Sequence, residues 1–318
     1  MNDINNEKNT LSYDYTIAAE NFTRARNKAF ISKLSNIMNS KQDDLLSFND
    51  VKEILKPKNQ IYMGMKTIPL NLIVGSEGRY RDFNKNFHPR KEFMRARWEN
   101  INRAQIKDIP LPAISLYEIG GAYFVRDGNH RVSVARLEGG EAIDAEVTSL
   151  SSEISIAPSM TTDDLRKAVI DLEKKIFYEK TLFLELTGDN GLNFTATGSY
   201  DRIYMHILDH KYYLNLDEQK EIPFSDALVS WYKKIYKPII KIINKEKLDS
   251  VFPGKSTSDL YILIVRHWDF QKRNKGYNYS VTASAKNFAH RYGNQQKQTI
   301  RIIRILLDKL FRKEAFVL

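Results

Sequence analysis

The sequence predicts an α+β protein in which a small mixed-sheet domain follows an N-terminal helical extension and precedes a mostly α-helical C-terminal domain. Residues 60–150 contain short apolar runs separated by glycine and proline, which is the pattern of strands and turns. Residues 13–40 and most residues after Tyr200 instead repeat their apolar side chains with a 3.6-residue period, which indicates amphipathic helices. The expected parts are an extension over 1–58, a mixed-sheet domain over 59–150, a linker over 151–162 and a helical domain over 163–318.

The N-terminal extension is expected to contain two helices. Residues 1–12 are polar, and we expect them to be disordered. The first helix is predicted over residues 13–40. The second is predicted over Phe48–Leu55, because Ser47 is a favoured residue before a helix and Pro57 ends one.

The mixed-sheet domain is predicted to alternate strands with helices and tight turns. Pro89 suits the first turn of a helix, and Gly120-Gly121 is a turn dipeptide between two apolar runs. The predicted elements, in chain order, are a strand at Ile68–Val74, a loop at Gly75–Phe83, a helix at Phe87–Ile106, a hairpin of Ala113–Ile119 and Ala122–Val125, and a last strand at Ala142–Val147.

The C-terminal domain is predicted to be mainly helical. Ser151–Thr162 is rich in serine and threonine, which is typical of a linker, and a helix is expected to start at Thr162. Leu182–Leu186 and Gly191–Thr197 are expected to form a small hairpin. Pro238 is expected to kink or break one of the later helices. Those helices are predicted at residues 199–214, 224–246, 256–274, 281–291 and 294–313.

The most informative segment is the turn Asp127–Arg131, which joins an apolar strand to the first apolar turns of a helix. A helix that begins in a tight turn presents unpaired N–H groups and the positive end of its dipole, which favours phosphate. Gly128 lets the backbone approach a ligand, and Arg131 can grip phosphate oxygens with its two-pronged guanidinium group. A plain hairpin turn is the alternative, because Asp-Gly is also a common turn dipeptide.

A strand, Asp-Gly-x-His-Arg and then a helix resembles the phosphate-binding motif of the ParB/sulfiredoxin superfamily, whose members bind CTP or ATP at this turn. Asp127–Arg131 is most similar to the Asp-Gly-His-His-Arg of the superfamily's free-serine kinases, whereas the chromosome-partitioning branch usually carries Gly-Glu-Arg-Arg. The resemblance covers roughly residues 60–150. The whole chain also resembles an uncharacterised bacterial family that is often labelled as transcriptional regulators, and that shares the Gly75–Phe83 loop.

The resemblance implies a small-molecule site built from two loops, with ATP or CTP and Mg²⁺ as its ligands. The implied phosphate-binding residues are Arg79, Arg81, Gly128, Asn129, His130 and Arg131. The implied catalytic residues are Glu77, Asp127 and His130. A glutamate in the first loop is the base in the superfamily's small-molecule kinases, which suggests this role for Glu77. Asp127 is the candidate Mg²⁺ ligand, and His130 can exchange a proton with a substrate.

The composition excludes several classes of chemistry. The 318 residues include no cysteine, which rules out disulfides, thiolate metal sites and the cysteine-dependent reaction of sulfiredoxins. The first ten residues are polar, so no signal peptide is expected. No apolar run approaches the roughly 20 residues that a membrane helix needs. We therefore expect a cytoplasmic protein with no membrane partner.

The net charge of +10 is concentrated near the C-terminus. Residues 271–318 hold 11 Lys and Arg against 2 Asp and Glu, and Arg79–Lys107 forms a second basic cluster with nine basic and three acidic residues. Focused positive charge attracts polyanions such as DNA, although a solvated basic surface is the alternative. The candidate nucleic-acid-binding residues are Lys297, Arg301, Arg304 and Arg312.

Two further motifs have simpler interpretations. Phe252–Thr257 resembles the end of a Walker A loop, but Asp249 stands where that motif needs glycine, so we expect Ser256 or Thr257 to cap a helix instead. His206 and His210 have a spacing that can seat a metal, but no glutamate follows His206, so a packed or surface pair is expected.

Three functions remain open from the sequence. The first is a nucleotide-binding enzyme or switch that acts as an NTP-dependent kinase or an NTPase. The second is a DNA-binding transcriptional or chromosome-associated regulator that uses the basic C-terminal region and takes nucleotide as its switch. The third is a non-catalytic assembly module whose helical half binds another protein. A homodimer is the expected oligomeric state.

Overall fold

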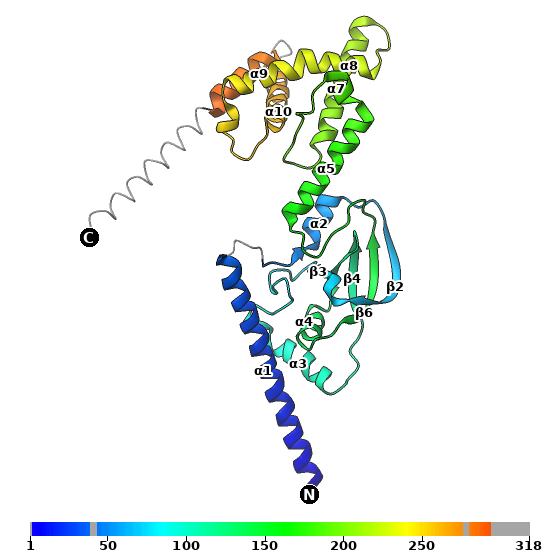
Figure 1. The fold of residues 1–318 in the computed structure, drawn as a ribbon, viewed down its shortest axis with the longest axis vertical. Helices are drawn as coiled ribbons and strands as arrows, with labels where there is room; N and C mark the ends of the chain where they lie inside the picture. The colour runs from blue at the N-terminus through cyan, green and yellow to red at the C-terminus, as the bar shows by residue number, and fades with distance from the viewer. Residues whose placement is uncertain (1, 39–42, 276–279, 294–318) are drawn as a thin grey trace, which may run out of the picture. The chain divides into compact units, whose positions relative to one another are not determined.

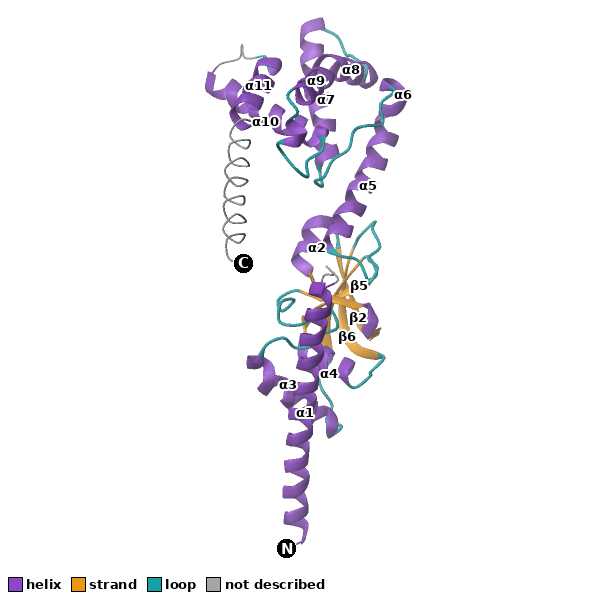
Figure 2. Cartoon of the chain, turned by 60° about the vertical axis from the view of Figure 1, so that its left-hand side comes forward, coloured by secondary structure: helices purple, strands orange, loops and turns teal. Residues whose placement is uncertain are grey.

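The computed structural model describes residues 2–38, 43–275 and 280–293 of the chain. It divides into two compact units, Met1–Arg166 and Lys167–Leu318, each of which has its own hydrophobic core (Figure 1 and Figure 2). The first unit contains a mixed sheet, and the described part of the second unit is helical, so the predicted α+β class is confirmed. Within the described ranges, no helix combines the length and the apolar character needed to cross a bilayer.

A six-stranded mixed sheet forms the centre of the first unit. Across the sheet the strands are β1 (Leu46–Ser47), β3 (Ile73–Ser76), β5 (Ala122–Asp127), β4 (Ile114–Ile119), β6 (Ala142–Leu150) and β2 (Gln60–Pro69). Strands β1, β3 and β5 are parallel, β4 is antiparallel to β5 and parallel to β6, and β2 is antiparallel to β6. The outer strand β2 carries a bulge between Tyr62 and Gly64.

Helices cover both faces of this sheet. Successive strand residues point to opposite sides, so both faces carry apolar side chains that helices can bury. Val125 belongs to the core that includes Phe22 of α1 (Asn2–Met38), Trp98 of α3 (Arg95–Ile106) and Val132 of α4 (Asn129–Leu137). Its neighbour Phe124 instead contacts α2 (Phe48–Leu55), whose Phe48 ring stacks on Tyr117 at a centroid distance of 4.3 Å. The strand β5 that ends at the turn Asp127–Arg131 is therefore packed on both faces.

Several predicted elements are confirmed with their local causes. Helix α2 spans Phe48–Leu55 as predicted, and the Ser47 hydroxyl accepts a hydrogen bond from the Asp50 N–H at 3.3 Å. The β4–β5 hairpin turns at Gly120 and Gly121, whose φ angles of 60° and 83° favour glycine. The predicted strand at Ala142–Val147 is β6, which continues to Leu150.

The single strand predicted at Ile68–Val74 is wrong. Strand β2 ends at Pro69, a 3₁₀ turn follows at Leu70–Leu72, and β3 begins at Ile73. The guanidinium group of Arg136 on α4 donates to the carbonyl oxygens of Leu70 and Ile73, the latter at 2.7 Å. This contact satisfies backbone groups that a continuous strand would have paired with a neighbouring strand.

The predicted start of the helix at Phe87–Ile106 is also wrong, because α3 begins at Arg95 after a 3₁₀ turn at Glu92–Met94. The side-chain carbonyl of Asn84 accepts the N–H groups of Asn86 at 3.1 Å and His88 at 2.9 Å. Phe87 has a φ of 59°, which a helix does not allow. A side-chain-stabilised turn therefore replaces the first part of the predicted helix.

The N-terminal helix is longer than predicted. Helix α1 begins at Asn2, so the prediction that residues 1–12 are disordered is wrong. The part of α1 that packs on α3 buries Ala18, Phe22 and Ala25, which lie on one helical face. The Phe22 and Trp98 rings meet edge to face with centroids 5.7 Å apart.

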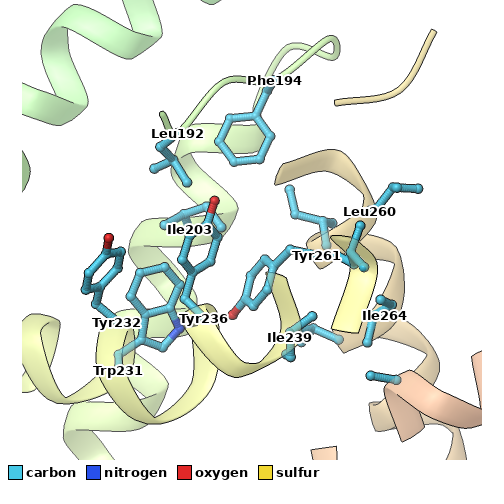
Figure 3. Packing of buried hydrophobic residues seen from close by; sticks show 14 of the residues in the cluster. Leu192, Phe194, Ile203, Trp231, Tyr232, Tyr236, Ile239, Leu260, Tyr261 and Ile264 are labelled. Carbon is cyan, nitrogen blue, oxygen red and sulfur yellow. Dashed lines mark hydrogen bonds between the residues drawn. The ribbon is translucent and has the colours of Figure 1, made fainter. Parts of the chain in front are cut away.

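The second unit is a helical bundle in its described residues. Its helices are α5 (Thr162–Thr181, which starts in the first unit), α6 (Phe183–Thr187), α7 (Ser199–Glu218), α8 (Phe224–Trp231), α9 (Lys237–Lys245), α10 (Thr257–Lys275) and α11 (Val281–Phe288), with short 3₁₀ and π turns at Leu248–Ser250 and Ala289–Gly293. Figure 3 shows aromatic side chains packed among the apolar residues of its core. The Trp231 indole N–H donates to the Tyr261 hydroxyl at 3.0 Å, so the polar end of this buried ring is satisfied.

One prediction in this unit is wrong, and the break predicted at Pro238 is confirmed. The hairpin predicted at Leu182–Leu186 and Gly191–Thr197 is wrong, because Phe183 starts α6 and its ring is fully buried in the core. The helix predicted over 224–246 is interrupted by a π turn at Tyr232–Tyr236, just before Pro238. A break there was expected, since proline lacks the N–H that continues the helical hydrogen bonds. The helix predicted at 294–313 lies outside the described residues.

We expect Phe22→Ala to lower the free energy of unfolding by about 3–5 kcal/mol, because it leaves a cavity between α1 and α3. Urea denaturation followed by circular dichroism measures this change. The matched control is Phe30→Ala on the same helix, whose ring is 62% exposed and whose loss should change stability little. Equal effects of the two substitutions would contradict the packing of α1 described above.

Candidate phosphate-binding site at the start of α4

The turn between β5 and α4 has a conformation that requires glycine. Gly128 has a φ of 107°, and a Cβ atom there would lie 2.4 Å from the Cγ2 atom of Ile114. The first helical hydrogen bond of α4 runs from the Val132 N–H to the Gly128 carbonyl at 3.0 Å, and no side chain caps the helix. The N–H groups of residues 129–131 therefore lie before the first helical bond, at the positive end of the helix dipole.

A cavity of about 330 Å³ lies at this helix start. It is formed by three segments that are distant in sequence: the loop after β3, one face of α3 and the β5–α4 turn. Its lining residues are Gly78, Arg79, Arg97, Ile101, Arg126, Asp127, Gly128, Asn129, His130 and Arg131. The structure therefore brings the predicted residue Arg79 together with all five residues of the predicted turn.

The Arg131 side chain is engaged by the protein itself. Its guanidinium group donates to the carbonyl oxygens of Pro112 and Ala113, the latter at 2.9 Å, and lies 2.5 Å from the Asp127 carboxylate. The side chain is only 13% exposed. Arg131 thus fixes the segment before β4 against the turn. The other residues of the lining are left to contact a ligand.

Arg97 is a lining residue that the sequence did not single out. It lies on α3, and the neighbouring Trp98 indole N–H donates to the Ser133 hydroxyl of α4 at 2.8 Å, which holds the two helices together. Arg79 is 3.5 Å from Asp82, but Asp82 also binds Lys91 at 2.8 Å. The basic cluster Arg79–Lys107 was the sequence signal that contained Arg97.

His130 is buried beside these arginines and is neutral near pH 7. Desolvation by burial, together with the positive charges of Arg97 and Arg79, lowers the pKa of His130 from 6.5 to about 4. Its ring lies edge-on to Phe83, and its Nδ1 atom has no hydrogen-bond partner among the described residues. The imidazole thus offers a neutral polar atom, while the positive charge comes from guanidinium groups.

Glu77 and Arg81 come from the predicted loop but are not among the residues that line the cavity. The Glu77 N–H donates to the Val125 carbonyl at 2.9 Å, which anchors the loop to β5. The Arg81 guanidinium carbon lies 5.4 Å from the centre of the Tyr80 ring.

The carboxylate of Asp127 is the acidic group of the cavity lining. It is 65% exposed and paired with Arg131. In the described part of the chain, no three His, Asp or Glu side chains gather as a metal site. A Mg²⁺ ion at Asp127 would therefore take most of its ligands from phosphate oxygens and water, which suits this cation.

The other predicted sites are less informative. The nucleic-acid-binding candidates Lys297, Arg301, Arg304 and Arg312 lie outside the described residues. Ser256 caps α10 as expected, since its hydroxyl accepts the Asp259 N–H at 3.0 Å. The His210 ring is hydrogen-bonded to Ser230 at 3.0 Å, and the His206 ring lies edge-on to Tyr261, so each histidine contacts a different partner.

Comparison with known proteins gives little further information. No family model matches the chain, and no curated protein matches it. Among solved structures, a Pnob8-like ParB-N domain is similar over 77% of this chain and 99% of its own, with 10% sequence identity and a TM-score of 0.20.

We expect the His130 imidazole to titrate near pH 4, well below a histidine in water. As the pH falls below 6.5, the unfolded chain takes up a proton at this position before the folded chain does, so the free energy of unfolding falls until about pH 4. Nuclear magnetic resonance of the imidazole carbons measures the midpoint. A midpoint near 6.5 would contradict the burial described here, and His130→Gln should reduce the loss of stability on acidification.

Proposed function

We propose that the cavity at the start of α4 binds the phosphate groups of a nucleotide such as ATP or CTP. The observation that carries this proposal is the uncapped helix start, which opens on a cavity whose lining includes four arginines. Backbone N–H groups at a helix N-terminus donate to phosphate oxygens, and the helix dipole favours negative charge there. A guanidinium group adds two parallel donors to the same kind of oxygen.

The charges around His130 support an anionic ligand. Arg79 and Arg97 line the cavity beside His130, and their positive charges help to lower the pKa of its imidazole. Arg131 holds the turn in place, and we propose that it supports the site without contacting the phosphates directly. The neutral His130 ring can donate or accept one hydrogen bond at the phosphate chain.

We propose binding as the function of this site, and phosphoryl transfer or nucleotide hydrolysis stays a prediction. A general base must lie within hydrogen-bond reach of the proton that it removes. Glu77 does not line the cavity, and Asp127 is already paired with Arg131. A nucleotide-dependent switch, with or without DNA as its partner, agrees with this arrangement as well as a kinase does.

The first test is calorimetric titration of the full chain with ATP and with CTP in the presence of Mg²⁺. Arg97→Gln removes one charged hydrogen-bonding group, so we expect it to weaken binding by roughly tenfold to a hundredfold. Arg103→Gln is the matched control on the same helix, because Arg103 stacks on Tyr15 and does not line the cavity. No binding of either nucleotide by the wild-type chain would overturn the proposal.

Glu77→Gln separates binding from turnover. Since Glu77 does not line the cavity, we expect the variant to bind nucleotide with the affinity of the wild type. The same titration measures this, and a coloured-complex assay of released phosphate measures any turnover. A tenfold loss of affinity would show that Glu77 contacts the ligand, whereas unchanged affinity with lost turnover would support its predicted role as a base.

A further inference from the structure

The lining of the cavity at the start of α4 suits phosphate better than it suits a nucleobase. Within the described part of the chain, none of the lining residues is Phe, Tyr or Trp, and Ile101 is the one large apolar side chain among them. Proteins that bind bases usually stack them on aromatic faces or enclose them in apolar slots. The cavity therefore lacks the surface that a base would need.

The charge of the lining suits a ligand with several negative charges. Four arginines and one aspartate line the cavity, but the Arg126 guanidinium group lies over the Tyr117 ring and Arg131 is paired with Asp127, so Arg79 and Arg97 supply its positive charge. The uncapped start of α4 adds further positive potential at the same place. A chain of phosphates can contact both guanidinium groups and the helix start at once, because its negative charges are spread along its length.

The size of the cavity agrees with this charge. Its volume of about 330 Å³ lies at the lower end of the roughly 300–1,000 Å³ found for small-molecule sites. A chain of phosphates bound at the start of α4 would fill part of that space. The nucleoside would then lie at the mouth of the cavity or outside it.

We infer, on the basis of the proposed function, that the site recognises a linear triphosphate and does not select the base attached to it. The donors are the N–H groups at the start of α4 together with Arg79 and Arg97, from two other segments of the first unit. The site thus takes a class of ligand, nucleoside triphosphates and inorganic tripolyphosphate, with the affinity determined mainly by the number of phosphates.

Calorimetric titration of the full chain with ATP, CTP, GTP, inorganic tripolyphosphate and pyrophosphate tests this inference, with MgCl₂ and ionic strength held constant. We expect dissociation constants for the three nucleotides and tripolyphosphate that agree within about tenfold, and weaker binding of pyrophosphate. A preference above tenfold for one base would overturn the inference while the proposed function stands. The same holds if a nucleotide binds and tripolyphosphate does not. No binding of any of the five ligands would overturn both.

Variants locate the bound anion. Arg97→Gln should weaken the binding of tripolyphosphate and of ATP by the same factor, because both ligands would use the same hydrogen-bond donors. Arg103→Gln, on the same helix but outside the lining, should change neither. Equal losses in the two variants would indicate non-specific attraction to a basic surface and would overturn the inference. If Arg97→Gln weakened the binding of ATP alone, the base would be in contact with α3, and the inference would be overturned as well.

Discussion

The geometry around the site depends on one half-buried guanidinium group, that of Arg131. Arg131 joins the carbonyl oxygens of Pro112 and Ala113 to the carboxylate of Asp127, so the residues before β4, the end of β5 and the start of α4 are held by a single side chain. Gly128 lies in the turn between Asp127 and Arg131, and a Cβ atom at this position would clash with the Ile114 side chain. The open helix start is therefore a consequence of how these three segments are joined.

The positive charge of the site comes from arginines and does not depend on protonation of His130. Buried His130 is kept neutral by desolvation and by neighbouring arginines, so the potential in the cavity comes from groups that stay charged at any physiological pH. The charge of the site itself should therefore change little between pH 6 and 8. A site that relied on a protonated histidine would instead lose affinity across that range.

The sequence indicated the local parts of this site better than the contacts between them. The turn at Gly128 could be predicted from adjacent residues, because a glycine between a strand and a helix allows the backbone conformation that a tight turn needs. Arg97 and the backbone contacts of Arg131 depend on tertiary packing of α3 and of the segment before β4, which no spacing encodes. The prediction of a continuous strand through Pro69 was wrong for a related reason. Arg136, on a helix distant in sequence, binds the carbonyl oxygens of Leu70 and Ile73.

The outer strand β2 has a consequence for how the sheet can associate. Its free edge carries exposed Ile61, Tyr62 and Met65, and such an edge is a template for another strand. The bulge between Tyr62 and Gly64 interrupts the regular spacing of its hydrogen-bonding groups, and Pro69 removes a donor at its end. The protein thus limits open-ended sheet extension by backbone geometry at an edge where its side chains would favour aggregation.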